Sequence, residues 1–191
     1  EDIHLLFYFL FLLIIFFVFL NFENNFSELF LSLTSSISNA GFSLNNTSNN
    51  LSFIFLILVI IGGSFFSTSS GIRFLKIYSL FKYSINEILS YSRPKNIYIN
   101  KHLFSKDSFK LDEIYKYFLS VIVFIISLLI LTFLLTLSGI DFESSFKLSI
   151  LTIMNTVNSS MFGLGDFSFY DLHFMTKYYL IFFMIVGRLE L

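Results

Sequence analysis

With 191 residues, 55% of them hydrophobic and only 13% charged, the chain has the composition of an integral membrane protein and not of an ordinary soluble domain. The absence of cysteine excludes disulfides and thiolate metal sites. The net charge of −1 conceals an asymmetry, because nine of the twelve Lys and Arg residues lie between Arg73 and Lys116. The positive-inside rule predicts that this basic segment is cytoplasmic. The acidic start, Glu1-Asp2, predicts no cleavable signal peptide.

The first 44 residues predict a transmembrane helix followed by a short helix that enters the membrane and returns. Residues 5–20 form an unbroken apolar run, just long enough to span a bilayer with the two residues before it. From Asn25 to Ile37 a helix is expected to measure about 20 Å, against an apolar core of about 30 Å, so this segment cannot cross. Irregular backbone at membrane depth is tolerated only where it lines a water-filled path or is buried in protein. The next residues, Ser38-Asn39-Ala40-Gly41-Phe42, are therefore predicted to be an ion filter that offers backbone carbonyls to a cation.

A second apolar run, residues 51–61, is interrupted by a segment rich in small residues. This break contains three glycines and five hydroxyl residues in ten positions, which are poor helix formers. We predict a flexible loop below the filter that acts as a gate. The residues assigned to it are Gly62, Gly63, Ser64, Ser67, Thr68, Ser69, Ser70 and Gly71. The alternative is close packing of helices through small residues.

The pattern then repeats after a polar, basic connector. We divide the chain into a first pore repeat (residues 1–85), a connector (86–116) and a second pore repeat (117–191). Sliding the chain by 117 positions lays the first apolar run on residues 122–137 and places Gly41 on Asn158. Both copies start on the cytoplasmic side, because the basic segment 82–116, predicted to be cytoplasmic, follows the first copy and precedes the second. The expected fold is thus an all-α integral membrane protein of two parallel repeats, each with a transmembrane helix, a re-entrant pore helix with a filter loop, and a transmembrane helix.

The second repeat supplies a second filter segment and one charged residue inside a span. Tyr117–Leu137 is the expected span, and Asp141 is placed to cap the pore helix that follows. The filter residues predicted there are Asn155, Thr156, Val157, Asn158 and Ser159. The outer loop from Ser160 to Thr176 is expected to expose its charged residues. The last span begins at Met175. Sliding the chain by 125 positions places Arg188 at the depth of the helix break in the first repeat. An ionisable residue inside a span is a functional candidate.

Enzymatic activity is not expected, because the spans contain no nucleophile pair, no metalloprotease motif and no paired carboxylates. A carrier with proton-relay residues is also disfavoured, because the two clean spans have no charged residue. A non-conducting structural subunit of a membrane complex is the alternative that stays open.

Together these segments resemble the membrane subunits of Trk/Ktr-type potassium uptake systems, the TrkH/KtrB family, which is related to HKT transporters. The most specific pieces are Asn39-Ala40-Gly41-Phe42, the interrupted helix with Gly62-Gly63-Ser64, Ser67-Thr68 and Gly71-Ile72-Arg73, and Gly187-Arg188-Leu189-Glu190. That family has four repeats around one pore, and the two in this chain resemble the third and fourth. The resemblance therefore implies a C-terminal half, which cannot conduct by itself.

The resemblance also implies the roles of the segments and the partners. It implies one filter loop per repeat, a gating loop at Gly62–Gly71, and an arginine, Arg188, that projects toward the pore. K⁺, or Na⁺ with it, would be the transported ion, with no cofactor. Expected partners are membrane lipid, a second copy in a homodimer, and cytoplasmic nucleotide-binding regulatory subunits of the TrkA/KtrA type at the basic connector; no nucleic-acid partner is expected. The protein would be a multi-pass protein of the cell membrane.

Two positions depart from the family pattern. Asn158 stands where the family usually has glycine, and Ser69-Ser70 replace part of a glycine-rich run. An Asn158 side chain at or beside the ion path predicts weaker selection of potassium. The alternative is that it points back into the protein, to a hydroxyl such as that of Ser159 or Thr156, without effect on selection.

Overall fold

A computed structural model describes residues 26–42, 49–61, 72, 74–92, 111–158, 160–164, 167–170 and 172–188. Every regular element in these segments is helical, which confirms the predicted all-α class for this part of the chain. The elements are α2 (Phe26–Ile37), α3 (Asn49–Ile60), α4 (Phe74–Ser92), α5 (Leu111–Leu137), α6 (Phe142–Met154), the 3₁₀ helix η2 (Ser160–Phe162) and α7 (Phe174–Arg188). The predicted first span, the predicted gate and the residues after Arg188 lie outside the described residues.

The helix α5 is the longest element and matches the span predicted for the second repeat. It begins at Leu111, six residues before the predicted start, and ends at Leu137 as predicted. Within the described part of the chain, α5 is the one helix that is long and apolar enough to cross a membrane, over Asp112–Leu137. Large apolar side chains such as Phe118, Leu129 and Phe133 are exposed along it. A helix with this much exposed apolar surface needs a lipid or protein surface around it.

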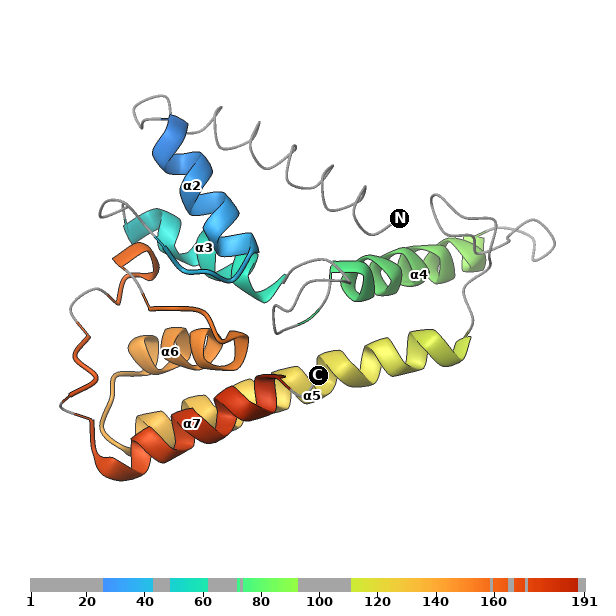
Figure 1. Ribbon diagram of the computed structural model, residues 1–191. Helices are drawn as coiled ribbons and strands as arrows, with labels where there is room; N and C mark the ends of the chain where they lie inside the picture. Colours follow the sequence, from blue (N-terminus) through green and yellow to red (C-terminus); the bar gives the residue numbers. More distant parts are fainter. Residues whose placement is uncertain are drawn as a thin grey trace.

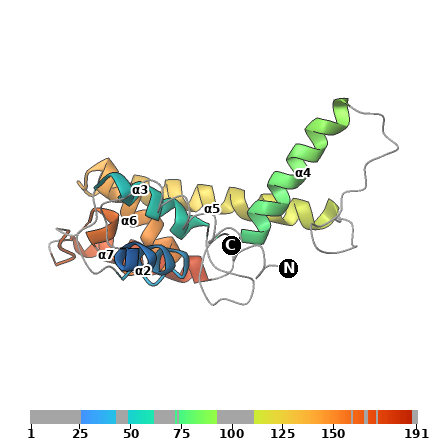
Figure 2. The same ribbon diagram turned by 90° about the horizontal axis from the view of Figure 1, so that it is seen from above.

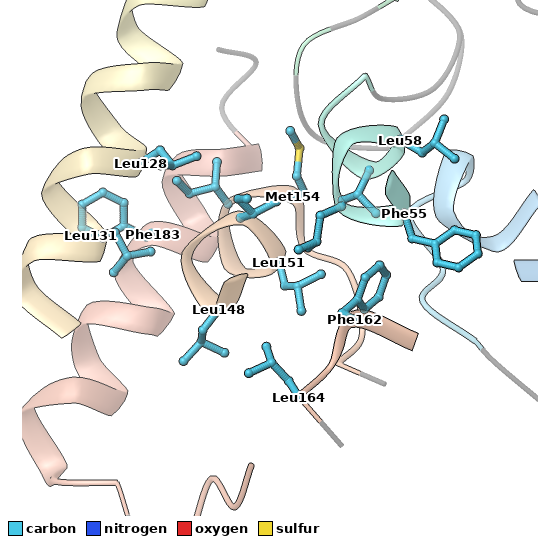
Figure 3. Close-up of a cluster of buried hydrophobic side chains, with 14 of the residues drawn as sticks. Phe55, Leu58, Leu128, Leu131, Leu148, Leu151, Met154, Phe162, Leu164 and Phe183 are labelled. Atoms are coloured by element: carbon cyan, nitrogen blue, oxygen red, sulfur yellow. The ribbon is translucent and has the colours of Figure 1, made fainter. Parts of the chain in front are cut away.

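The short helix α6 lies at the centre of the packing. It contacts α5, α7 and α3, while α5 and α7 lie side by side (Figure 1). From Leu148 to Met154 every residue of α6 is buried. The surrounding side chains come from other elements, among them Phe55 of α3, Phe162 of η2 and Phe183 of α7 (Figure 3). A helical segment that is buried on all sides is stable only when its neighbours enclose it, and the neighbours of α6 do so.

Several buried hydroxyl groups in α2 and α6 are satisfied by their own helices, although Ser35 Oγ of α2 is buried without a partner among the described residues. Ser32 and Ser36 donate to the carbonyls four residues earlier, at 2.9 and 2.7 Å. Ser149 and Thr152 do the same in α6, at 2.7 and 2.6 Å. A buried polar group is costly only when it lacks a hydrogen bond. Helices that contain these hydroxyl residues can therefore pack in an apolar interior.

The helix α4 crosses the predicted boundary between the first repeat and the connector. That boundary, after Ile85, falls inside a helix that continues without interruption to Ser92. The first part of α4 packs on α5, where Lys76 Nζ donates to Ser120 Oγ at 3.0 Å. Farther along, α4 diverges from α5, as the second view shows (Figure 2). The basic segment therefore starts as a helix, and residues 93–110 lie outside the described part.

Candidate ion filter

The turn after α2 reverses the chain through a left-handed asparagine. Asn39 has φ 57°, and its N–H donates to Ser36 O at 3.2 Å. The N–H groups of Ala40 and Gly41 both donate to Ser35 O, at 3.0 and 3.4 Å. Bonds of this kind use up the last carbonyls of a helix and end it sharply, and asparagine is, after glycine, the residue that most readily adopts the left-handed conformation.

The turn after α6 has the same construction. Asn155 has φ 54°, its N–H donates to Thr152 O at 3.1 Å, and the N–H of Thr156 donates to Leu151 O at 2.9 Å. The two left-handed asparagines are 116 positions apart, one fewer than the predicted slide of 117. By backbone conformation Gly41 therefore corresponds to Val157, and Asn158 corresponds to Phe42. The register that the sequence predicted is one residue too long at the turns.

The two turns lie directly against each other. Gly41, at φ 79°, is buried, and a Cβ built on it would overlap the carbonyl oxygen of Val157 and lie 2.9 Å from its nitrogen. Only a residue without a side chain permits this approach of two backbones. Part of each predicted filter segment is open to solvent: Phe42 is 68% exposed and Val157 is 55% exposed. The structure thus brings the two predicted segments together at one place.

The remaining predicted filter residues are arranged around this contact. Ser38 is exposed, and Ala40 is half-buried. Asn39 and Thr156 are buried. Ser159 lies outside the described residues. Both helices direct their C-terminal, partially negative ends toward the turns, which favours a cation there.

The side chain of Asn158 is tied to the loop that follows. Its Nδ2 donates to Leu164 O at 3.2 Å, while its Oδ1 is buried without a hydrogen-bond partner among the described residues. The acceptor is a backbone carbonyl and not one of the hydroxyls considered from the sequence. This loop was expected to expose its charged residues, and its apolar residues Met161, Phe162 and Leu164 are buried. Among its charged residues, His173 is exposed as expected.

Two contacts join the end of α6 to the last turn of α7. Asn155 Nδ2 donates to Met184 O at 3.1 Å. A Cβ built on Gly187 would overlap Ile153 O and lie 2.9 Å from the carbonyl carbon. The next residue, Arg188, is exposed at the end of α7. The predicted gate, residues 62–71, lies outside the described residues, so its position relative to Arg188 stays a prediction.

An ion pair marks the other end of α6. Lys147 Nζ lies 2.6 Å from Glu143 Oε1, and its hydrogen bond and positive charge lower the pKa of Glu143 below the ordinary value for a glutamate. The Lys147 side chain is only 16% exposed, whereas that of Glu143 is 80% exposed. Asp141 occupies the N-cap position as predicted, but its side chain makes no capping hydrogen bond.

Sequence reasoning predicted the two segments that meet here and missed what holds them in place. The contact of Asn155 with α7 joins residues far apart in the chain, and that of Asn158 with Leu164 depends on how the following loop folds, so no periodic pattern reports them. One signal was present: Gly187 is a glycine inside an apolar helix, which often marks a close approach of another backbone.

Comparison with known protein families identifies the family of the chain. A family model described as "TrkH: Cation transport protein" matches residues 22–191. The chain belongs to the TrkH family of cation transport proteins. No curated protein sequence matches the chain.

A solved structure shares the fold. The potassium transporter TrkH from Vibrio parahaemolyticus is similar to this TrkH-family chain with a TM-score of 0.70 and 21% sequence identity. The similarity covers 85% of this chain and 35% of that transporter. The chain therefore spans about a third of the length of the transporter that it matches.

Proposed function

We propose that this chain is part of the membrane subunit of a potassium uptake system and contributes two of the filter loops that line its ion path. The observation that carries the proposal is the meeting of two short helix ends, each turned by a left-handed asparagine, at Gly41 and Val157. Membership of the TrkH family supports cation transport as the activity. The similar solved structure is that of a potassium transporter, which supports potassium as the ion.

The filter in this proposal consists of residues 38–42 and 155–159. Their backbone carbonyls would replace water around a dehydrated cation, as carbonyl rings do in other cation filters. The C-terminal ends of α2 and α6 add partial negative charge at the same place. In a ring of four such loops, these would be two, and the other two would have to be supplied from outside these 191 residues.

We propose further that residues 62–71 and Arg188 act together as a gate. Arg188 carries a permanent positive charge and five donors, so beside the path it would repel cations and hold hydroxyls or carbonyls of the loop. A place for Arg188 beside the path is consistent with the structure, because Arg188 lies one helical turn beyond Met184, whose carbonyl accepts a hydrogen bond from Asn155 of the filter turn. Arg188→Ala and shortening of the loop are each expected to raise flux.

The charge pattern supports a topology in which residues 82–116 would lie in the cytoplasm. The family resemblance suggests the partners: a second copy in a homodimer, and nucleotide-binding regulatory subunits that would contact this basic segment. A cysteine introduced at Ser108 is expected to react with an impermeant reagent from the inside. Reaction from the outside would overturn this topology.

The decisive experiment restores the missing half of the pore and measures rubidium or potassium uptake in a host that lacks its own uptake system. Uptake that depends on the chain supports transport. Full membrane assembly without uptake would instead indicate a structural subunit.

A further inference from the structure

We propose that Asn155 is a positioning residue, which ties the second filter turn to the helical turn of α7 that carries Arg188. The inference rests on the proposed function, because it assigns a consequence for ion flow to this contact. Its basis is that two contacts with α7 fall within one turn of helix: one is made by the filter's left-handed residue, Asn155, and the other by Ile153, two residues before it.

In the first contact, Asn155 donates a hydrogen bond to a backbone carbonyl that also accepts one from the N–H of Arg188. In an α-helix the carbonyl of Met184 accepts the N–H of the residue four positions later, which is Arg188. A carbonyl oxygen has a second lone pair, and Asn155 Nδ2 donates to it at 3.1 Å. The same side chain lies 3.4 Å from Ile153 O, in its own helix end. Asn155 therefore bridges the last turn of α6 and the last described turn of α7.

The second contact fixes the distance between the two helices. Gly187 lies against Ile153 O so closely that no Cβ fits between them. Because the backbones are in direct contact, a movement of α7 toward α6 at Gly187 would displace the end of α6. Since Ile153 lies just before the filter segment and Asn155 is its first residue, such a movement would couple the position of Arg188 to that of the filter.

The corresponding residue of the first turn provides a matched control. Asn39 has the same left-handed conformation, φ 57° against 54°, and ends the equivalent helix. Its helix, α2, packs on α3. Replacing either asparagine by glycine keeps the left-handed turn available and removes the amide, so the two substitutions differ in what the amide contacts.

The test uses the complete transporter in a cysteine-free background, with a single cysteine in place of Arg188. The rate at which a thiol reagent modifies this cysteine reports the environment of position 188 independently of transport. Asn155→Gly is expected to change the rate by about threefold to tenfold, as loss of one hydrogen bond would change a two-state equilibrium. Asn39→Gly is expected to leave it unchanged. Equal changes in both variants, or no change with Asn155→Gly, would overturn the proposal.

Uptake measurements supply the second readout. With Arg188 present, Asn155→Gly is expected to alter flux; in the Arg188→Ala background it is expected to add nothing, because it acts through Arg188. Additive effects would contradict the proposal. Asn155→Asp, which keeps the volume and cannot donate, serves where the glycine variant fails to assemble. A wild-type protein without uptake would defeat the proposed function, whereas the labelling rates would still decide the role of Asn155.

Discussion

The turns after α2 and α6 have the same backbone geometry but are held in place by different means. The first is built around Gly41, which presses its backbone on Val157 of the second turn. The second is held by side chains: Asn155 donates to α7, and Asn158 donates to the loop after η2. The first turn is thus positioned by the second, and the second by its own repeat.

This difference predicts an order of sensitivity. A close contact between two backbones cannot adjust to an added atom by a change of rotamer, because neither partner is a side chain. A side-chain hydrogen bond can be replaced by water or by a small shift. Substitutions at the glycine contacts should therefore have larger effects than substitutions at the asparagine contacts.

The largest effect is expected from Gly41→Ala. The new Cβ would overlap the Val157 carbonyl and also sit on a backbone at φ 79°, where a side chain alone costs about 1–2 kcal/mol. Since about 1.4 kcal/mol corresponds to a factor of ten, we expect at least a tenfold loss of rubidium uptake in the completed transporter, at normal amounts of protein in the membrane.

Gly139→Ala is the matched control for that loss. Gly139 has φ 92°, but a Cβ there meets nothing within 4 Å. It therefore suffers the backbone strain without the overlap. Equal loss of uptake in both variants would mean that strain, and not the contact with Val157, explains the effect of Gly41→Ala.

Gly187→Ala should come second. Its backbone is helical, so alanine improves helix propensity by about 1 kcal/mol, yet the Cβ must displace Ile153 O at a cost of about 1–3 kcal/mol. We expect a lower melting temperature in detergent, by a few degrees for a net loss of about 1 kcal/mol. Ile185→Ala, at an exposed position of the same helix, is the control. A stabilised Gly187→Ala protein would show that α7 does not need this approach.

The elements were predictable because their signals are local. The start and end of α2, the C-terminal end of α5 and the start of α7 agree with the sequence within about a residue, since apolar length and helix-breaking residues determine them. The two segments predicted to form the filter were located in the same way, from helices too short to cross.

The contacts between segments were not predictable. Nothing in the sequence distinguishes Asn155, a left-handed cap bonded to α7, from any other asparagine. The register of the turns depends on where each helix ends, and one residue of difference moves Asn158 from the place of Gly41 to that of Phe42. The burial of Met161 and Phe162 depends on α3 and α6 packing around them.

Asn158→Gly tests the weaker, side-chain anchor of the second turn. From the sequence, the glycine variant could have improved potassium selection. Because the Asn158 amide is directed to Leu164 O, we expect instead that Asn158→Gly lowers the free energy of unfolding by about 1 kcal/mol, the contribution of one hydrogen bond. The ratio of potassium to sodium permeation should stay within about twofold of that of the wild type, a change of less than about 0.5 kcal/mol. Measured permeation ratios decide between the two. A clearly sharper preference for potassium in the variant would place the side chain beside the ion path.

The smallest effect should come from Glu143→Gln at the far end of α6. Lys147 lowers the pKa of Glu143, so the folded protein binds this proton less tightly than the unfolded chain. The ion pair therefore contributes stability above the ordinary glutamate pKa, and the contribution disappears as the pH falls through the lowered pKa of the folded state. The contribution is small, because the carboxylate is exposed and screened by water. Melting temperatures of wild type and Glu143→Gln should differ slightly at neutral pH and converge on acidification. Lys147→Met, which replaces the ammonium group by an uncharged side chain of similar length, should abolish this pH dependence. A difference that grows as the pH falls would show that the pair does not stabilise the helix end.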